Sequence, residues 1–245
     1  GAGLAELVRR YRVPVWSLPP ATSTVQRVLQ YPVCLLVISD SYAIMVGPDT
    51  GLGRQELAGE GWALGVMLQP AAGAMLLGGP VSRLADERMA LDDVPTLDGS
   101  ALTDRVRAAL ENAPTEPTAH RAAIVVLEAA LDEVGTADDE GILVNRIVEY
   151  VEERPEVQRV GQVCEHFDIG ERTLQRLTAR RIGLSPKWLI QRRRLHDAAE
   201  RLRSGDSVDL ASVAMELGYA DQAHFTRDFR TVTGLTPGGF AREPH

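Results

Sequence analysis

The sequence predicts an α+β fold: an N-terminal domain with a small antiparallel β-sheet or barrel and helices, and an all-α C-terminal domain with two helix-turn-helix units. Two observations carry this prediction. Short β-rich runs separated by turn residues fill roughly the first 70 residues. Two helix-turn-helix patterns, joined by one long helical pattern, fill roughly the last hundred. A length of 245 residues with 44% apolar residues is enough for two ordinary domains.

Five strands are expected between Tyr11 and Met67, because β-branched and aromatic residues concentrate there in short runs. They are Arg12 to Ser17, Thr24 to Leu29, Val33 to Ile38, Tyr42 to Val46 and Trp62 to Leu68. Turn signals separate them, such as the Gly-Pro-Asp-Thr-Gly run at 47–51. A helical segment is expected from Pro70 to Leu77, and another turn or two from Val81 to Met89.

Two longer helices come next. Ser100 is the expected N-cap of the first, which carries Leu102, Val106 and Leu110 on one face. The second spans 118–134, and its apolar surface is so wide that burial on two sides is expected. Either a second subunit, in a homodimer through helix 118–134, or an ordinary core within one subunit would cover its outer side.

The polar, flexible segment 135–141 is the expected linker between the domains. The first domain therefore covers residues 1–134 and the second covers 142–245. The second is expected to begin with a helix that stops before Pro155.

The stretch 210–233 reads as a helix, a tight turn and a second helix. Val213 and Leu217 face inward, Gly218 supplies the turn, and Asp221 is the expected cap of the second helix. Phe225, Phe229 and Val232 anchor that helix. Its remaining polar positions suit a helix that enters a DNA major groove, and they are Gln222, His224, Thr226, Arg227 and Arg230.

The same scheme begins earlier at Val160, so the chain contains an internal repeat. Leu174 and Leu177 anchor the second helix of this unit. Its polar positions are Arg172, Gln175, Arg176, Arg180 and Arg181. Arg176 and Arg227 fall at matching places, and the segment Pro186 to Arg203 between the units reads as one long stiff helix.

Charge is distributed unevenly. The chain has a formal net charge of −8, yet residues 141–245 alone carry about +1. Eight basic residues and no acidic one lie between positions 172 and 194. These side chains, together with Arg230, are expected to meet DNA phosphates where they do not read bases. The expected phosphate contacts are Arg180, Arg181, Lys187, Arg192, Arg193, Arg194 and Arg230.

Residues 141–242 closely resemble the DNA-binding domain of AraC/XylS-type transcription regulators. The final pattern G-Y-x-D-x-x-H-F-T-R-x-F-R-x-x-x-G-x-T-P-x-x-F-x-R is similar to that family's signature over its whole length. The resemblance implies seven helices in this domain and base contacts from matching positions of both second helices. These positions are Arg172, Gln175, Arg176, Gln222, Ala223, His224 and Arg227.

The sequence departs from the family pattern at both turns. Asp168 stands where the first turn usually has Gly, and Gly170 stands where Ser or Thr usually caps the first recognition helix. Ala220 occupies the matching place in the second unit. Loss of these hydroxyl caps leaves the work of capping to Gly170 and Asp221.

The N-terminal segment resembles, over roughly residues 12–110, a sensing domain found in an actinobacterial branch of AraC-like regulators. Val46-Gly47-Pro48 and Leu91-Asp92-Asp93 are among the short motifs that carry this resemblance. A small-molecule effector is therefore a possible partner. Some aromatic and Met side chains could line its pocket, although such residues are plain core more often than not. They are Trp16, Tyr42, Met45, Trp62, Met67 and Met75.

These features predict a cytoplasmic transcription regulator that binds double-stranded DNA, rather than an enzyme. No cofactor or metal is expected, because His120 is the sole His before residue 141 and no Gly-rich phosphate loop is present. The family habit is activation, with RNA polymerase as the expected partner. The alternative is an interaction protein whose helix-turn-helix units no longer bind DNA by themselves. Under the DNA-binding hypothesis, loss of Arg193 should weaken binding to all sequences alike.

Overall fold

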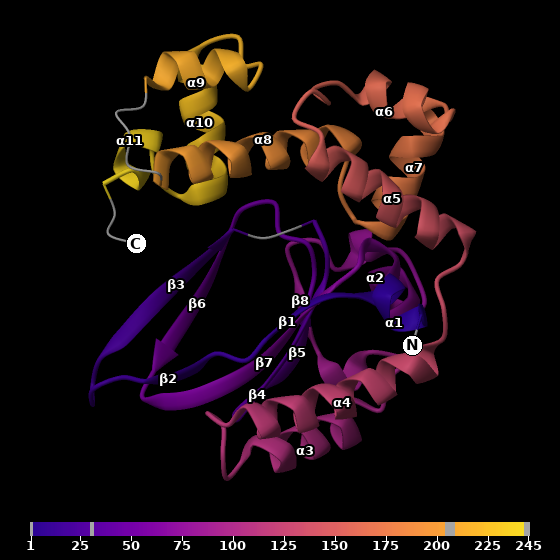
Figure 1. The fold of residues 1–245 in the computed structure, drawn as a ribbon, viewed down its shortest axis with the longest axis vertical. Coiled ribbons are helices and arrows are strands. Elements are labelled where there is room, and N and C mark those ends of the chain that lie inside the picture. Colours follow the sequence, from indigo (N-terminus) through magenta and orange to yellow (C-terminus); the bar gives the residue numbers. More distant parts are fainter. Residues whose placement is uncertain (1, 30–31, 204–208, 243–245) are drawn as a thin grey trace.

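A computed structural model describes residues 2–29, 32–203 and 209–242. The observed fold is α+β, as predicted, with an antiparallel sheet and its helices below a layer of helices formed by the C-terminal part (Figure 1). The N-terminal part contains, in order, α1 (Ala2–Leu7), β1 (Val8–Arg12), β2 (Val15–Ser17), β3 (Ser23–Leu29), β4 (Leu35–Ser39), β5 (Ala43–Val46), β6 (Leu52–Ala58), β7 (Glu60–Leu68), α2 (Pro70–Leu77), η1 (Val81–Arg83), β8 (Arg88–Ala90), η2 (Leu91–Asp93), α3 (Gly99–Leu110) and α4 (Pro117–Val134).

The main sheet has the strand order β1-β7-β4-β5-β8, and β2 pairs with the first residues of β7. All these pairs are antiparallel. Leu64, Val66 and Leu68 are fully buried at every second position of β7, which is the period of a strand with one face on the core. β3 and β6 form a separate two-stranded antiparallel ribbon that rises toward the C-terminal helices (Figure 1).

Two corrections concern the strands. The single strand expected from Arg12 to Ser17 is wrong, because the chain breaks at Pro14 into β1 and β2. A prolyl nitrogen cannot donate to a sheet ladder. β6, β8 and α1 were not predicted, and the segment from Val81 contains only the short turn η1 before β8 begins at Arg88.

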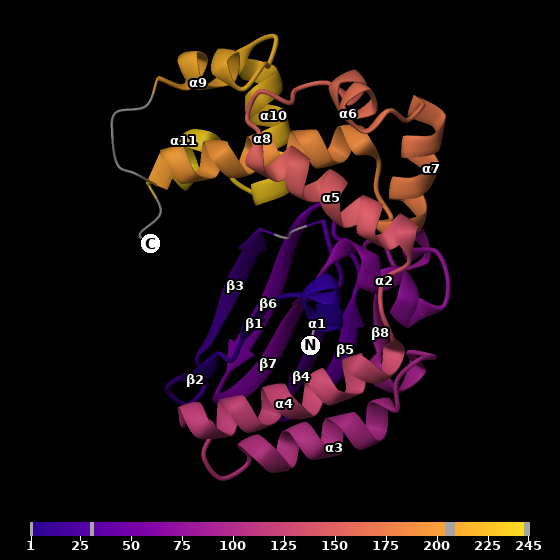
Figure 2. The ribbon, with the colours of Figure 1, turned by 45° about the vertical axis from the view of Figure 1, so that its right-hand side comes forward.

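Helices α3 and α4 pack side by side beneath the sheet (Figure 2). Asp98, not Ser100, caps α3: its carboxylate accepts a hydrogen bond from the Ala101 N–H at 3.0 Å. Within this chain α4 is buried on one side only. Leu127 has no exposed surface, whereas Val125 on the outer side is 61% exposed. The expectation of burial on two sides is therefore not met by the single subunit.

The C-terminal part contains α5 (Asp139–Glu153), α6 (Val160–Phe167), α7 (Glu171–Arg181), α8 (Pro186–Arg203), α9 (Leu210–Glu216), α10 (Gln222–Thr233) and α11 (Pro237–Phe240). Two separate apolar clusters hold these helices. Leu174 and Leu177 of α7 lie in the first cluster, and Phe225 and Phe229 of α10 lie in the second. The long helix α8 spans both, with Leu189 in the first cluster and the following turns in the second.

The two parts touch at a polar junction. Asn145 of α5 accepts a hydrogen bond from the Ala71 N–H of α2 at 2.9 Å and donates to the Glu6 carbonyl at 3.0 Å. Arg9 of β1 forms an ion pair with Glu152 of α5. α5 begins at Asp139, inside the segment expected to be the linker, because Asp138 caps it through a hydrogen bond from the Gly141 N–H.

Candidate nucleic-acid interface

The first helix-turn-helix unit consists of α6 and α7. Asp168 in the turn has a φ of +51°, a left-handed conformation that Asp tolerates better than most side chains. Gly170 is the N-cap of α7, as expected, and provides no side-chain cap. Leu174 and Leu177 point into the domain.

The opposite face of α7 is exposed. Its polar side chains include the three residues that the family resemblance assigns to bases, Arg172, Gln175 and Arg176, and all three are exposed. Gln175 donates from Nε2 to Glu171 Oε1 at 3.1 Å, one helical turn earlier. This face therefore presents guanidinium donors beside an amide and a carboxylate.

The second unit consists of α9 and α10. Gly218 lies in the turn with a φ of +75°, and Asp221 caps α10 by accepting a hydrogen bond from the His224 N–H at 2.7 Å. Both features agree with the sequence prediction. Phe225 and Phe229 are fully buried and fix the side of α10 that faces inward.

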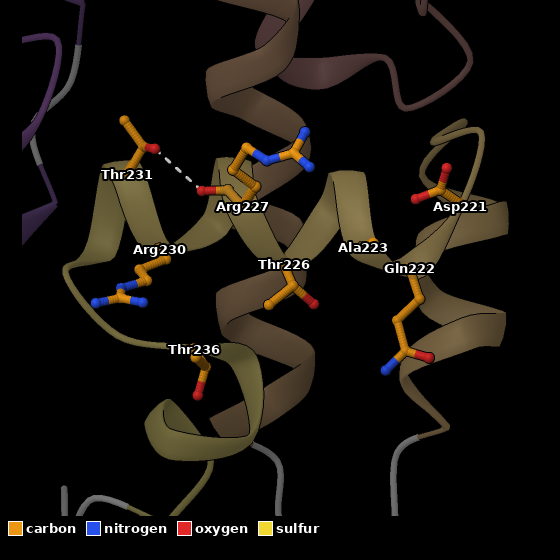
Figure 3. A pocket seen from close by; sticks show the side chains of 8 residues that line it. All are labelled: Asp221, Gln222, Ala223, Thr226, Arg227, Arg230, Thr231 and Thr236. Carbon is orange, nitrogen blue, oxygen red and sulfur yellow. Dashed lines mark hydrogen bonds between the residues drawn. The ribbon is translucent and has the colours of Figure 1, made fainter.

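An open groove of about 890 Å³ follows the outer side of α10 (Figure 3). Its walls are Asp221, Gln222, Ala223, Thr226, Arg227, Arg230, Thr231 and Thr236. The Thr231 hydroxyl donates to the Arg227 carbonyl at 3.0 Å. Of the six positions on this helix that the sequence proposed for DNA contact, all except His224 thus border one concave surface.

His224 stands apart from that groove. Its ring meets Tyr219 edge-on at a centroid distance of 5.2 Å, and its Nε2 lies 3.5 Å from Asp228 Oδ2. Gln191 of α8 also donates to that carboxylate, at 2.5 Å. These contacts favour a packing role for His224 over the base contact that the resemblance implies.

The expected phosphate contacts divide by burial. Arg180, Lys187 and Arg230 are exposed, whereas Arg192 is 3% and Arg193 6% exposed. Arg193 donates to the main-chain carbonyls of Pro155 at 3.1 Å and Val157 at 3.0 Å, and it pairs with Asp197 at 2.7 Å. Both Arg192 and Arg193 therefore lie inside the domain, and their burial does not support the expected contact with DNA phosphates.

Three further arginines have partners within the chain. Arg181 is buried and pairs with Asp138 at 2.5 Å and Glu140 at 3.3 Å. Burial alone would raise the pKa of Asp138, but the hydrogen bonds from Arg181 and the Gly141 N–H, together with the charges of Arg181 and Arg180, lower that pKa. Arg194 is half-buried, with its guanidinium carbon 4.1 Å from the centre of the Tyr219 ring. Arg180 forms an exposed ion pair with Glu140.

The second helix of each unit, α7 or α10, runs toward the N-terminal part. α7 and α10 lie at opposite ends of α8, and their last turns approach the sheet domain (Figures 1 and 2). α7 packs against η1. Gly183, two residues after the end of α7, lies so close to η1 that an added Cβ would be 3.1 Å from the Val81 carbonyl oxygen. α10 contacts the β3–β6 ribbon. The first turns of both helices, which carry Arg172 and Gln222, point away from the sheet.

The expected effector-pocket side chains do not converge on one described cavity. Met45 and Trp62 belong to the buried core of the N-terminal part. Trp16 of β2 donates a hydrogen bond from its indole N–H to the Ala58 carbonyl at 3.3 Å. Tyr42, Met67 and Met75 are half-buried.

A different hollow, of about 250 Å³, lies at the junction of the two parts. Arg9 and Pro32 line it from the N-terminal part, and helices α5 and α8 supply the other walls. The residues on these helices are Val148, Val151, Glu152, Leu189, Arg192, Arg193, His196, Asp197 and Glu200. Sequence reasoning missed this hollow because its walls come from segments far apart in the chain.

Within the described ranges, no group of three or more His, Cys, Asp or Glu side chains could hold a metal ion. Among those same residues, no helix has the length and apolar character needed to cross a membrane.

Comparisons with known proteins match the two parts separately. Residues 163–243 match the family described as a helix-turn-helix domain, and residues 1–90 match a domain of unknown function, DUF6597. The HTH-type transcriptional regulator YfiF of Bacillus subtilis is 34% identical over 82 residues, which are 34% of this chain and 26% of YfiF.

Two transcriptional activators show similar likeness. VirF of Yersinia enterocolitica, a virulence regulon transcriptional activator, is 30% identical over 80 residues, covering 32% of this chain and 29% of VirF. RhaS of Pectobacterium carotovorum is 30% identical over 77 residues, covering 31% of this chain and 27% of RhaS. The chain thus spans little more than a quarter of the relatives it matches.

A solved structure of ToxT from Vibrio cholerae aligns with 95% of this chain and 98% of that chain at 12% identity. The TM-score is 0.46, and nothing about the function of this chain follows from that likeness. The sequence similarity to these regulators lies in the C-terminal part. Residues 163–243 match the helix-turn-helix domain family and are similar to segments of bacterial transcriptional regulators.

Proposed function

We propose that this chain is a transcription regulator that binds double-stranded DNA in a sequence-specific manner through α7 and α10. One observation carries the proposal: each helix of a homologous helix-turn-helix pair exposes Arg and Gln side chains on the face opposite its buried Leu or Phe anchors. Arg and Gln suit guanine and adenine edges in the major groove. The long helix α8 would hold α7 and α10 about one helical turn of DNA apart.

In this proposal the side chains divide into two groups. Base contacts come from Arg172, Gln175 and Arg176 of α7 and from Gln222 and Arg227 of α10. Phosphate contacts come from the exposed Arg180, Lys187 and Arg230. Such contacts fix the position of the protein on DNA but carry no sequence information.

Selection of random duplexes on the purified chain, at two salt concentrations, tests the proposal. Wild-type protein should enrich two short motifs about one helical turn apart. Arg176→Ala should lose the motif read by α7, and Arg227→Ala the motif read by α10. A bidentate Arg contact contributes roughly 1–3 kcal/mol of base discrimination.

Arg105→Ala is the matched control, because Arg105 is exposed on α3, the helix farthest from α7 and α10 in Figure 1. It removes the same charge and should leave both motifs intact. Weak, sequence-blind binding by wild-type protein that modest salt abolishes would instead favour the interaction-protein alternative. Arg230→Ala should reduce affinity for all sequences and make the salt dependence shallower by about one phosphate contact.

We propose that residues 1–134 sense a small effector, in the manner of the actinobacterial AraC-like branch, and that residues 142–245 bind DNA. The junction hollow is the better-placed effector site, because both parts contribute walls and a ligand there would act on their relative position. Glu200→Trp at its rim should block effector-dependent changes in DNA affinity. If an effector still acted on this variant, its site would lie elsewhere.

Homodimer formation and contact with RNA polymerase complete the proposal. The outer side of α4 exposes an apolar stripe formed by Ala122, Val125 and Ala129, which supports a second subunit at that helix. A DNA target in a bacterial cell implies the cytoplasm. Sedimentation of wild-type protein and of Val125→Glu would test the dimer, since a charge in the middle of the interface should produce monomers.

A further inference from the structure

We infer that Glu171, which no sequence signature assigns, is a specificity-determining residue of the half-site read by α7. Its carboxylate would select a base that carries a major-groove amino group and would position Gln175 for adenine. This inference rests on the proposed DNA-binding function and deepens it by naming base chemistry for that half-site.

The internal repeat gives the first argument. Arg176 and Arg227 occupy matching places, so Glu171 matches Gln222 and Gln175 matches Thr226. Both Gln222 and Thr226 line the open groove along α10. The equivalent row on α7 is therefore expected to face the same groove of DNA, and Glu171 is exposed there.

The geometry of α7 gives the second argument. Residues four apart lie on one side of a helix, so Glu171 and Gln175 form a row beside the row of Arg172 and Arg176. The Gln175 Nε2 donates to Glu171 Oε1 at 3.1 Å. This bond fixes which way the amide points, while the second N–H of that nitrogen and Gln175 Oε1 stay available for the N7 and N6 atoms of adenine.

The chemistry of a carboxylate gives the base preference. An ionised Glu side chain only accepts hydrogen bonds. In the major groove cytosine and adenine present an amino group, whereas guanine presents O6 and thymine presents O4 as acceptors. Glu171 Oε2 would therefore accept from cytosine N4 or adenine N6 and would be repelled by guanine and thymine. The adjacent arginines would favour guanine, which separates the roles of the two rows.

The test compares base-preference profiles from random-duplex selection on the full chain and its variants. Wild-type protein should show a column restricted to C or A next to a column of A. Glu171→Ala should reduce the preference for C or A in the first column by about tenfold and weaken the preference for A in the second column. Glu171→Gln keeps an acceptor for Gln175. Compared with Glu171→Ala, it should therefore recover the preference for adenine in the second column, while G and T should also be selected in the first column. Gln175→Ala should lose only the adenine column.

Charge provides a readout that a merely structural residue would not move. Glu171→Ala and Glu171→Gln should both bind unrelated duplexes more tightly than wild type, because one negative charge leaves the DNA-facing side. Glu149→Ala, on the exposed side of α5, is the matched control and should leave the profile unchanged. Thermal unfolding of each variant checks that the domain is intact.

The outcomes separate the two proposals. A wild-type profile with two motifs that stays identical in Glu171→Ala would overturn the role of Glu171 and leave the DNA-binding function standing. Absence of any enrichment by wild-type protein would overturn both. A C/A column that persists in Glu171→Gln would also exclude the carboxylate as the discriminating group.

Discussion

Arg193 shows how burial changes the role that is inferred for a basic residue. In the sequence it belongs to a run of eight basic side chains, and nothing in that run separates a phosphate contact from an interior residue. In the structure its guanidinium donates hydrogen bonds to the main-chain carbonyls of Pro155 and Val157, which follow the end of α5. Main-chain carbonyls inside a domain need donors, and a long Arg side chain can supply several at once.

Arg193→Ala should therefore act on folding. The change leaves two carbonyls without their donor and Asp197 without its ion pair, so the free energy of unfolding should fall by about 3 kcal/mol. Urea unfolding measures this, with Arg105→Ala as the exposed control that should change stability by less than about 0.5 kcal/mol. Unchanged stability together with weaker, sequence-independent DNA binding would restore the phosphate role.

The same variant should depend on pH. Burial raises the pKa of Asp197 even though Arg193 lowers it, so removing Arg193 should raise that pKa further. A carboxyl group with a raised folded pKa destabilises the fold when it is ionised, and this cost vanishes as the pH falls below its ordinary value. The destabilisation by Arg193→Ala should be larger at pH 7 than at pH 4. An equal loss at both pH values would show that Asp197 does not need the guanidinium.

At the scale of single elements, the helices of the C-terminal part could be predicted and several N-terminal elements could not. Inward residues such as Leu174 and Phe225 repeat at helical spacing, and Gly218 and Asp221 mark the turn and cap chemically. β6 has the sequence LGRQELA, with no β-branched or aromatic residue, so its strand conformation comes from pairing with β3. α1 is six residues long, too short to carry a periodic signal.

The candidate site was predictable only in part, for a related reason. Helical spacing identifies which side chains of α7 and α10 face outward, because that depends on local geometry. It cannot show that Arg181 meets Asp138 or that Arg9 meets Glu152, because these pairs join distant segments. The matching place of Gln222 in the repeat was the signal that could have identified Glu171.

The two turns make a paired test of backbone strain. Asp168 has a φ of +51° in the first turn and Gly218 a φ of +75° in the second. Asp168→Gly should stabilise the domain by up to about 1 kcal/mol, since Gly adopts this conformation without a Cβ penalty. Gly218→Ala should destabilise it by about 1 kcal/mol or more, because a Cβ is strained at this φ; the added Cβ would lie 2.7 Å from Gln158 Oε1, a contact that this flexible side chain can relieve.

Chemical denaturation of both variants gives the two differences in unfolding free energy. Gly161→Ala, on the open first turn of α6 where a Cβ meets nothing within 4 Å, is the control for a Gly substitution without strain. A destabilising Asp168→Gly would mean that the Asp168 side chain contributes more than its backbone conformation costs.

At the scale of the whole molecule, the junction joins the two parts by polar contacts rather than by a shared apolar core. The apolar clusters of the two parts are separate, and Gln69, the N-cap of α2, provides no side-chain hydrogen bond to that helix. Asn145 from α5 satisfies the Ala71 N–H in its place. One helix of the N-terminal part is thus capped by a residue of the C-terminal part, so the first turn of α2 depends on the position of α5.

Asn145→Ala should therefore loosen α2 and the junction together. Loss of a side-chain cap costs about 1 kcal/mol, so hydrogen exchange at the Ala71 amide should become about fivefold faster while amides in the core of α8 keep their protection. Asn112→Ala, at an exposed position after α3, is the matched control. If α7 is restrained through this junction, DNA affinity should change in Asn145→Ala with the base preferences preserved. Unchanged exchange at Ala71 would show that the cap is not formed in solution, and unchanged affinity with faster exchange would show that the junction does not restrain the recognition helices.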